Sequence, residues 1–262
     1  MILAVDIGNT SICLGAYEDG QGLRFRAKLT ADRRKSADEY SVLIAGIFAM
    51  NNADTSAVTG AMLLSVVPTL THTLRSALSK FGIEPLLVGS GIKTGLNIRV
   101  DSPGMLGADI VADTVAALRK KEPPLIVIDL GTATTITAIN DKNELCGCII
   151  APGVRASLDA MSEKCAQLSE VSLSKPEKLL GTNTNDSVNS GAVWGTALML
   201  DGFINRIRSE YALGDRLSII ATGGLSELII PYCENQILLE PDLTLNGLYR
   251  LYQINSRPKS RR

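Results

Sequence analysis

The chain has 262 residues, of which 45% are hydrophobic, 4% aromatic and 20% charged, a composition that excludes global disorder and suits one large domain or two small ones. Lysine and arginine number 26 against 27 aspartates and glutamates, so a net charge of −1 gives no overall field that would attract nucleic acid or an anionic membrane. We therefore expect neither nucleic acid nor membrane as a partner.

Strand-like and helix-like segments alternate along the first half of the chain, as is typical of an α/β protein. It opens with three strands and no intervening helix, predicted at residues 2–5, 12–17 and 23–29. A helix at 36–50 begins with Ser36 and Glu39 in the spacing of a capping box. The pattern then predicts a strand at 61–67, a helix at 69–81, a strand at 86–88, a loop at 89–107 and a helix at 108–121.

The second half begins after Pro123-Pro124 and repeats the opening pattern of three strands. Its predicted elements are strands at 125–128, 134–139 and 145–150, helices at 154–165 and 187–211, a strand at 217–221, and helices after Gly224 and at 243–254. We therefore expect an N-terminal lobe of residues 1–122, a C-terminal lobe of residues 123–255 and a basic tail of residues 256–262.

Targeting signals and metal-binding patterns are lacking. The first residues contain no basic leader of the kind that signal peptides have. The longest apolar stretch of the chain, residues 57–68, is too short to span a bilayer, so we expect a soluble, cytoplasmic protein. The five cysteines are scattered, and we expect buried thiols, including Cys146 and Cys148, rather than disulfides or a zinc site. The single histidine, His72, is expected to be a surface or satisfied helix residue, which leaves carboxylates, hydroxyls and backbone amides for chemistry.

One short pattern occurs twice. Val5-Asp6-Ile-Gly-Asn-Thr10 and Ile128-Asp129-Leu-Gly-Thr-Ala133 both place a strand before an aspartate, an apolar residue, a glycine and a small polar residue. Each copy is followed by two more strands, so the sequence predicts a duplicated fold with a ligand cleft between its lobes.

The two turns have the chemistry of phosphate binding. In the first, Asp6 can hold Mg²⁺ through water, Gly8 lets a phosphate approach the backbone, and the next three residues supply donors. A single copy fits an ordinary hairpin turn equally well, but two facing copies would grip both ends of a polyphosphate. A third element, Ala221-Thr-Gly-Gly-Leu225, suits a nucleotide's sugar and α-phosphate. The Gly-x₄-Gly-Lys-Ser/Thr loop and the Gly-x-Gly-x-x-Gly fingerprint are both absent.

The order of these turns resembles the actin, hexokinase and heat-shock ATPase superfamily, and residues 1–255 resemble the type III pantothenate kinase family. The matching segments are Asp6-Ile-Gly-Asn-Thr10, Thr30-Ala-Asp-Arg-Arg-Lys-Ser-Ala-Asp-Glu-Tyr40, Ser65-Val-Val-Pro68, Gly107-Ala-Asp109, Asp129-Leu-Gly-Thr-Ala-Thr-Thr135, Ala151-Pro-Gly153, Gly181-Thr-Asn-Thr184, Ser190-Gly191 and Ala221-Thr-Gly-Gly224. The resemblance implies two duplicated actin-like, ribonuclease H-like lobes with a nucleotide cleft between them.

The resemblance also implies an activity: phosphorylation of pantothenate by ATP, the first step of coenzyme A synthesis. It implies Mg²⁺, a monovalent cation (K⁺ or NH₄⁺) and a homodimer. By position it assigns catalysis to Asp109, Mg²⁺ to Asp6, the monovalent cation to Asp129, and ATP binding to Asp6, Ile7, Gly8, Asn9, Thr10, Ser11, Ile12, Cys13, Thr132, Gly223 and Gly224. The substrate contacts are Val100, Gly107, Ala108, Asp109, Ile110 and Thr184, of which Thr184 would reach the partner's site.

Without the resemblance, Asp109 would be interpreted as a helix-capping residue. The substrate side departs from the family pattern, because Ile110 and Val100 stand where relatives place an arginine and a tyrosine, and Thr135-Ile-Thr137 replaces a Thr-Phe-Asp-like segment. Three hypotheses follow: a pantothenate kinase in which Arg99 or Arg155 replaces the missing arginine, a kinase of another small alcohol, or a regulatory ATP-binding paralogue without turnover.

Overall fold

The computed structural model describes residues 1–89, 91–165, 171–211, 213 and 216–256, which divide into two compact units. The first unit comprises Met1–Gly95, Ser102–Ala116 and the described residues from Leu243 onward. The second comprises Leu96–Asp101 and Ala117–Asp242. This division differs from the expected lobes of residues 1–122 and 123–255, because the last helix belongs to the first unit and residues 96–101 belong to the second. The described residue of the expected tail, Ser256, ends that helix, and residues 257–262 lie outside the described chain.

The first unit is built on a five-stranded sheet with the order β3-β2-β1-β4-β5. Antiparallel pairs join β1 to β2 and β2 to β3, and parallel pairs join β1 to β4 and β4 to β5. The elements are β1 (Ile2–Ile7), β2 (Ser11–Glu18), β3 (Gly22–Thr30), α1 (Ala37–Met50), η1 (Thr55–Ala57), β4 (Gly60–Ser65), α2 (Pro68–Ser79), β5 (Pro85–Leu87), η2 (Pro103–Met105) and α7 (Leu243–Ser256).

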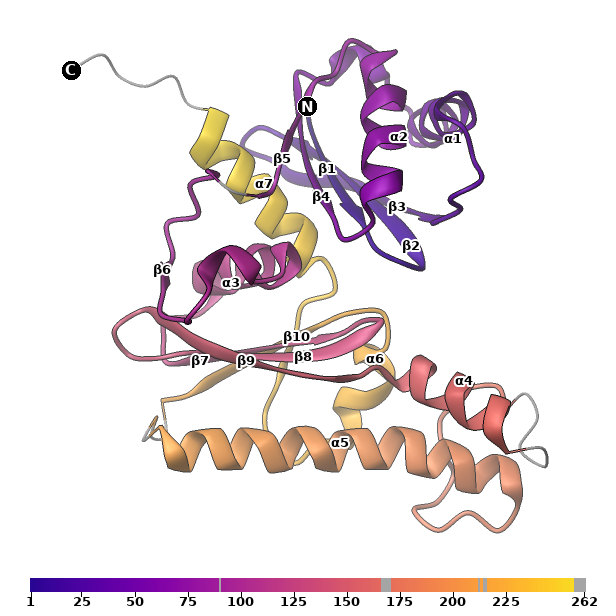
Figure 1. Cartoon of the computed structure of the whole chain (residues 1–262), viewed down its shortest axis with the longest axis vertical. Helices are drawn as coiled ribbons and strands as arrows, with labels where there is room; N and C mark the ends of the chain where they lie inside the picture. The colour runs from indigo at the N-terminus through magenta and orange to yellow at the C-terminus, as the bar shows by residue number, and fades with distance from the viewer. Residues whose placement is uncertain (90, 166–170, 212, 214–215, 257–262) are drawn as a thin grey trace. The chain divides into compact units, whose positions relative to one another are not determined.

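Helices cover both faces of this first sheet (Figure 1). On one face, alternate β1 residues such as Leu3 and Val5 share a buried cluster with Tyr40 of α1 and Leu74 of α2. The predicted Ser36–Glu39 capping box is present at the start of α1. On the other face α7 packs against β1, β2 and β4. The sequence periodicity predicted this helix but not the sheet that receives it.

Tyrosine contacts fix α7 on the first sheet. The rings of Tyr17 in β2 and Tyr249 in α7 stack with centroids 4.4 Å apart, and the Tyr17 hydroxyl donates a 3.0 Å hydrogen bond to Asn246. A Cβ at Gly60 would overlap the Tyr252 hydroxyl, so the glycine makes room for this ring. A stacked aromatic pair adds about 0.5–1.5 kcal/mol beyond its buried area.

The second unit contains a six-stranded sheet with the order β11-β10-β7-β8-β9-β6. The core of Ile126, Ile128, Ala197 and Leu200 lies between this sheet and its helices, chiefly α5. The elements are β6 (Asn97–Ile98), β7 (Leu125–Leu130), β8 (Ala133–Ile139), β9 (Glu144–Pro152), α4 (Val154–Lys164), α5 (Thr184–Glu210), β10 (Ser218–Thr222), α6 (Ser226–Ile229), η3 (Ile230–Tyr232) and β11 (Leu238–Leu239); α3 (Ala108–Lys120) begins in the first unit and ends in the second.

The two sheets share one topology, which confirms the predicted duplication. In each, a three-strand antiparallel meander (β1-β2-β3 or β7-β8-β9) is extended by two parallel strands, β4 and β5 in the first and β10 and β11 in the second. The second sheet adds β6, which pairs with the outer strand β9. Asp6 and Asp129 occupy equivalent places near the ends of β1 and β7.

The cysteine prediction was partly wrong. Cys148 and Cys165 are exposed, whereas Cys13, Cys146 and Cys233 are partly buried. Burial, assisted by the nearby Asp201 carboxylate, raises the pKa of Cys233 to about 12. His72 lies exposed on α2, as predicted. None of the helices in the described residues combines the length and hydropathy that a membrane span requires.

Candidate active site

The first Asp-x-Gly turn joins β1 to β2 within the first unit. Gly8 N–H donates a 2.9 Å hydrogen bond to the Ser11 carbonyl, which closes the turn. The Thr10 carbonyl accepts a 3.1 Å hydrogen bond from Ala31 N–H, so the loop after β3 lies beside the turn. Asn9 is exposed at its tip. The predicted ATP residues Asp6 to Cys13 therefore form one continuous strand-turn-strand segment.

Cys13 faces the start of this segment. It pairs directly with Asp6 across the β1–β2 ladder. Burial is the main cause that raises the pKa of the Cys13 thiol, and the Asp6 carboxylate is the second. The thiol therefore ionises less readily than an ordinary cysteine, next to the carboxylate proposed for cation binding.

The Gly107–Ile110 segment opens α3 in the first unit. Asp109 is the second residue of the helix, and its Oδ1 accepts a 2.9 Å hydrogen bond from Ile110 N–H. A Cβ on Gly107 would overlap that same Oδ1, so the glycine leaves the space in which the carboxylate rests. Ile110 is only 5% exposed. The residue that replaces the family's arginine is thus a buried aliphatic side chain.

Val100 belongs to the second unit, in the segment that carries β6. It is partly exposed and follows Arg99, whose Nε lies 2.9 Å from Glu144 Oε1. Hydrogen bonds from Asn140 and Arg99 lower the pKa of Glu144. Arg99 is therefore already paired with a carboxylate.

The second Asp-x-Gly turn is packed closely by two distant glycines of the second unit. Gly223 follows β10 with a φ of +96°, and a Cβ there would lie 2.5 Å from the Leu130 backbone and overlap the Asp129 carboxylate. Gly153 precedes α4, and its Cβ would lie 2.7 Å from the carbonyl carbon of Thr132. The structure thus places the Gly223 backbone against the Asp129 turn, to which Thr132 also belongs.

Gly153 was missed as a contributor to this site. It lies 20 residues after the turn in sequence, and only its place in the Ala151-Pro-Gly153 segment signalled a role. Its contact with Thr132 brings the N-terminus of α4 to the turn. A helix N-terminus favours anionic groups, which suits a phosphate site.

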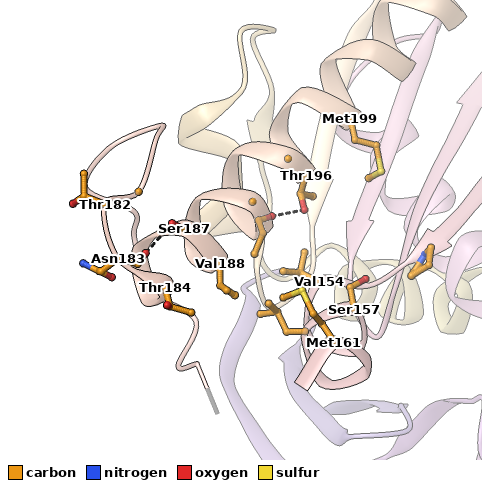
Figure 2. Close-up of a pocket in the computed structure, with 16 residues that line it drawn as sticks. Val154, Ser157, Met161, Thr182, Asn183, Thr184, Ser187, Val188, Thr196 and Met199 are labelled. Atoms are coloured by element: carbon orange, nitrogen blue, oxygen red, sulfur yellow. Dashed lines mark hydrogen bonds between the residues drawn. The ribbon is translucent and has the colours of Figure 1, made fainter. Parts of the chain in front are cut away.

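Thr184 is the first residue of α5 and lies on the rim of a cavity of about 800 Å³ in the second unit. Figure 2 shows Thr182, Asn183 and Thr184 at one end of this cavity, with Val154 and Met161 of α4 opposite Val188 of α5. Asn183 caps α5 by accepting a 2.9 Å hydrogen bond from Asp186 N–H. None of the other predicted site residues lines this cavity.

The sequence model of the type III pantothenate kinase family matches residues 2–206. The chain belongs to this family. Type III pantothenate kinases of Roseiflexus castenholzii and Exiguobacterium sp. are 41% and 38% identical to it, over 97% and 98% of this chain and 99% and 100% of theirs.

Solved structures of other proteins resemble this pantothenate kinase family member in fold alone. The activator of 2-hydroxyisocaproyl-CoA dehydratase from Clostridium difficile, solved with bound ADPNP, matches with a TM-score of 0.58 and 11% identity over 97% of this chain and 94% of that one. Component A of (R)-2-hydroxyglutaryl-CoA dehydratase from Acidaminococcus fermentans matches with a TM-score of 0.58 and 13% identity over 97% and 98% of the two chains. The predicted actin-like α/β fold class is confirmed.

Proposed function

We propose that the chain phosphorylates pantothenate with ATP, giving 4′-phosphopantothenate and ADP in the first step of coenzyme A synthesis. The observation that carries the proposal is membership in the type III pantothenate kinase family, with relatives about as long as the chain itself. Asp6, Asp109 and Asp129 are all present at the positions where the family resemblance predicts them. A module that only binds ATP has no need of a base, so the regulatory alternative is disfavoured.

Asp109 is proposed as the base. The hydroxyl oxygen of pantothenate forms a bond to the γ-phosphorus, the bond from that phosphorus to the β–γ bridging oxygen breaks, and the hydroxyl proton passes to Asp109. Phosphoryl transfer depends chiefly on alignment and charge neutralisation, so one carboxylate suffices for the proton. The space at Gly107 allows the carboxylate to stay at the helix start rather than be displaced by a methyl group.

Mg²⁺ and a monovalent cation fit the residues present. Mg²⁺ is usually held by one or two carboxylates together with substrate phosphates, which agrees with Asp6 beside a glycine-containing turn. Asp129 lies in a cradle that a Cβ on Gly223 would fill, and we assign it to K⁺ or NH₄⁺. Within the described residues no group of three or more His, Cys, Asp or Glu could serve as an all-protein metal cage. The bound cations would neutralise charge on the phosphates.

Thr132, Gly223 and Gly224 are proposed to bind ATP in the second unit, and Asp6 to Cys13 in the first. The support for the second set is the closeness of Gly223 to the Asp129 turn, because only a glycine at a φ of +96° lets the two backbones meet there. Backbone amides and the nearby α4 N-terminus supply donors without adding bulk.

Arg155 is the better candidate to replace the family's missing arginine. Arg99 is paired with Glu144, whereas Arg155 is exposed at the start of α4 and has no carboxylate partner in the described part of the chain. Gly153, which packs on Thr132, immediately precedes α4, so Arg155 stands two residues after a backbone contact with the second turn. We expect Arg155→Gln to raise the KM for pantothenate about ten-fold or more, with Arg99→Gln as the matched control.

A homodimer is proposed, with a second copy covering the cavity between α4 and α5. Leu179 and Leu180, just before the cavity rim, are 56% and 82% exposed, and Leu198 of α5 is 53% exposed. Gly195 lines the cavity and has open space at its Cβ position. Thr184 on the rim is the residue that the family resemblance assigns to the partner's substrate site.

The dimer is tested by placing a charge in that cavity. Gly195→Arg should give a monomer in light scattering and lose pantothenate turnover, because each copy would lack its partner's Thr184. Gly46→Arg is the control, because Gly46 is also an exposed helical glycine with open space at its Cβ position. A Gly195→Arg variant that stays dimeric with full turnover would exclude this interface.

The function is tested by ADP release from Mg-ATP with and without K⁺, using pantothenate and a panel of small hydroxy acids and alcohols. K⁺-dependent release that requires pantothenate is expected. ADP release only with another alcohol would identify that alcohol as the substrate in place of pantothenate. ATP binding without any ADP release would favour the regulatory function.

A further inference from the structure

The loop between β3 and α1 is fixed beside the first phosphate turn. Ala31 N–H donates to the Thr10 carbonyl, and the buried Tyr40 hydroxyl both accepts from Asp32 N–H and donates to the Asp32 carbonyl, each at 3.0 Å. The capping box at Ser36 then starts α1. Residues 31–36 are therefore held at both ends, and the side chains between them project from a defined backbone.

Two adjacent arginines on this loop have different partners. Arg34 is committed to Asp32, with Nε 3.2 Å from Oδ1 and Nη2 3.3 Å from Oδ2. Hydrogen bonds from Arg34 lower the pKa of Asp32. Arg33 has no carboxylate partner among the described residues, and its Nη2 donates a long, 3.4 Å hydrogen bond to Asn9 Oδ1 in the phosphate turn.

We propose that Arg33 binds the polyphosphate of the nucleotide held by the Asp6–Ser11 turn. This rests on the proposed function, because it assumes that the turn binds ATP. The hydrogen bond to Asn9 holds the Arg33 guanidinium at the turn and uses only one of the five N–H donors of the guanidinium. The remaining donors form a planar fork that matches phosphate oxygens, and the charge stays available because no described carboxylate neutralises it.

The chemistry favours the β- and γ-phosphates over the α-phosphate as the ligand. The terminal phosphates carry most of the charge of ATP, and charge develops there during phosphoryl transfer. The second unit already offers Gly223 and the α4 N-terminus to a nucleotide. In the first unit the Arg33 guanidinium contacts the same turn that carries Asp6, so it adds positive charge where the terminal phosphates would bind.

The experiment compares Arg33→Gln, Arg33→Lys and the neighbouring control Arg34→Gln in the full chain. Calorimetric titration gives the Kd values for ATP, ADP and AMP with Mg²⁺ present, and steady-state assays give kcat and both KM values. We expect Arg33→Gln to weaken ATP binding about 10- to 100-fold, the range of a lost charged hydrogen bond, while AMP binding and the KM for pantothenate stay unchanged. Arg33→Lys should lie between, because it keeps the charge without the fork.

The control should change each value less than about two-fold, since Arg34 is exposed and paired with Asp32. Equal loss of ATP and AMP affinity in Arg33→Gln, or no loss, would overturn the proposal. The experiment distinguishes failure of this proposal from failure of the proposed function. If the wild-type chain binds ATP through Arg33 but does not phosphorylate pantothenate, only the proposed function is wrong. A wild-type chain that does not bind ATP would overturn both.

Discussion

The Asp6 and Asp129 turns lie on topologically equivalent strands, but different contacts surround them. In the second unit, backbone from Gly223 and Gly153 packs on the Asp129 turn so closely that a Cβ at either glycine would collide with main-chain atoms. In the first unit, a Cβ on Gly8 would lie 3.2 Å from the Ser11 carbonyl oxygen. From outside this turn, the loop after β3 contributes the Ala31 backbone hydrogen bond to Thr10 and the Arg33 side chain.

This difference shows how duplicated topology can diverge. Strand order decides where each carboxylate is placed, since Asp6 and Asp129 are the next-to-last residues of corresponding strands. The surrounding contacts then distinguish the two turns. Backbone atoms of Gly223 and Gly153 pack on the second turn, whereas the positively charged side chain of Arg33 contacts the first. A Cβ added at a glycine that packs on the second turn should therefore act on folding, and substitutions near the first turn should act on binding.

The largest effect is expected from Asp109→Asn, which should lower kcat about 10²- to 10⁴-fold at every K⁺ concentration, because the amide cannot accept the hydroxyl proton. Asp129→Asn should instead abolish the response to K⁺. Steady-state kinetics with varied K⁺ separate the two carboxylates, and the Kd for ATP verifies that the first variant retains its nucleotide site. Full turnover by Asp109→Asn would remove the assignment of the base.

The second prediction compares the glycine that packs on the second turn, Gly223, with the glycine inside the first turn, Gly8. Gly223→Ala should destabilise the protein by about 2–4 kcal/mol, because its φ of +96° strains any side chain and its Cβ meets the Leu130 backbone. Gly8→Ala should change stability by less than about 1 kcal/mol, since a small shift relieves its single contact. Urea unfolding measures both, and equal losses would contradict the difference in packing.

A smaller effect is expected at Gly107, where the neighbour is a side chain rather than backbone. Gly107→Ala would push the Asp109 carboxylate from its place, and a misplacement of about 1 Å can cost roughly 100-fold in rate. We expect kcat to fall about 10- to 100-fold while the melting temperature changes little. Gly104→Ala is the matched control because its Cβ position is open, and equal kcat values for the two variants would refute the role of this space.

The sequence predicted the features that depend on local patterns. Apolar runs such as 2–5 and 125–128 specified buried strands, the Ser36 and Glu39 pair specified a helix start, and the repeated Asp-x-Gly pattern specified the duplication. Strands of two residues, β6 and β11, are too short for periodicity to detect. The exposure of Cys148 was also missed, because alternation along β9 does not tell which face is covered.

Contacts between distant segments could not be predicted. The periodicity of residues 243–254 indicates an amphipathic helix but not that Gly247 packs on the Ala112 carbonyl or that Tyr252 fills the space at Gly60. The same holds at the site, where Gly153 meets Thr132 and Arg33 meets Asn9 through loops separated in sequence. Such contacts depend on the order of the strands in each sheet, and no short segment of the sequence reveals that order.

The smallest predicted effect concerns the thiols of the two units. Burial and the Asp6 carboxylate raise the pKa of Cys13, so at pH 8 its thiolate fraction is below that of an ordinary cysteine and its alkylation should be slow. Cys148 is exposed on β9 and serves as an internal control in the same sample. Peptide mass spectrometry after iodoacetamide treatment should find Cys148 labelled well before Cys13, with labelling of Cys13 increasing as pH rises above about 9.

Asp6→Asn sharpens this test, because it removes the negative charge that opposes ionisation of Cys13 while leaving the burial in place. The rate at Cys13 should then rise modestly relative to Cys148, and denaturant should bring the two thiols to similar rates. An unchanged Cys13 rate in this variant would mean that the Asp6 charge is already neutralised in the free protein by the side chains around the first turn. Equal rates for both thiols in the native wild type would show that the first turn opens more freely than its hydrogen bonds indicate.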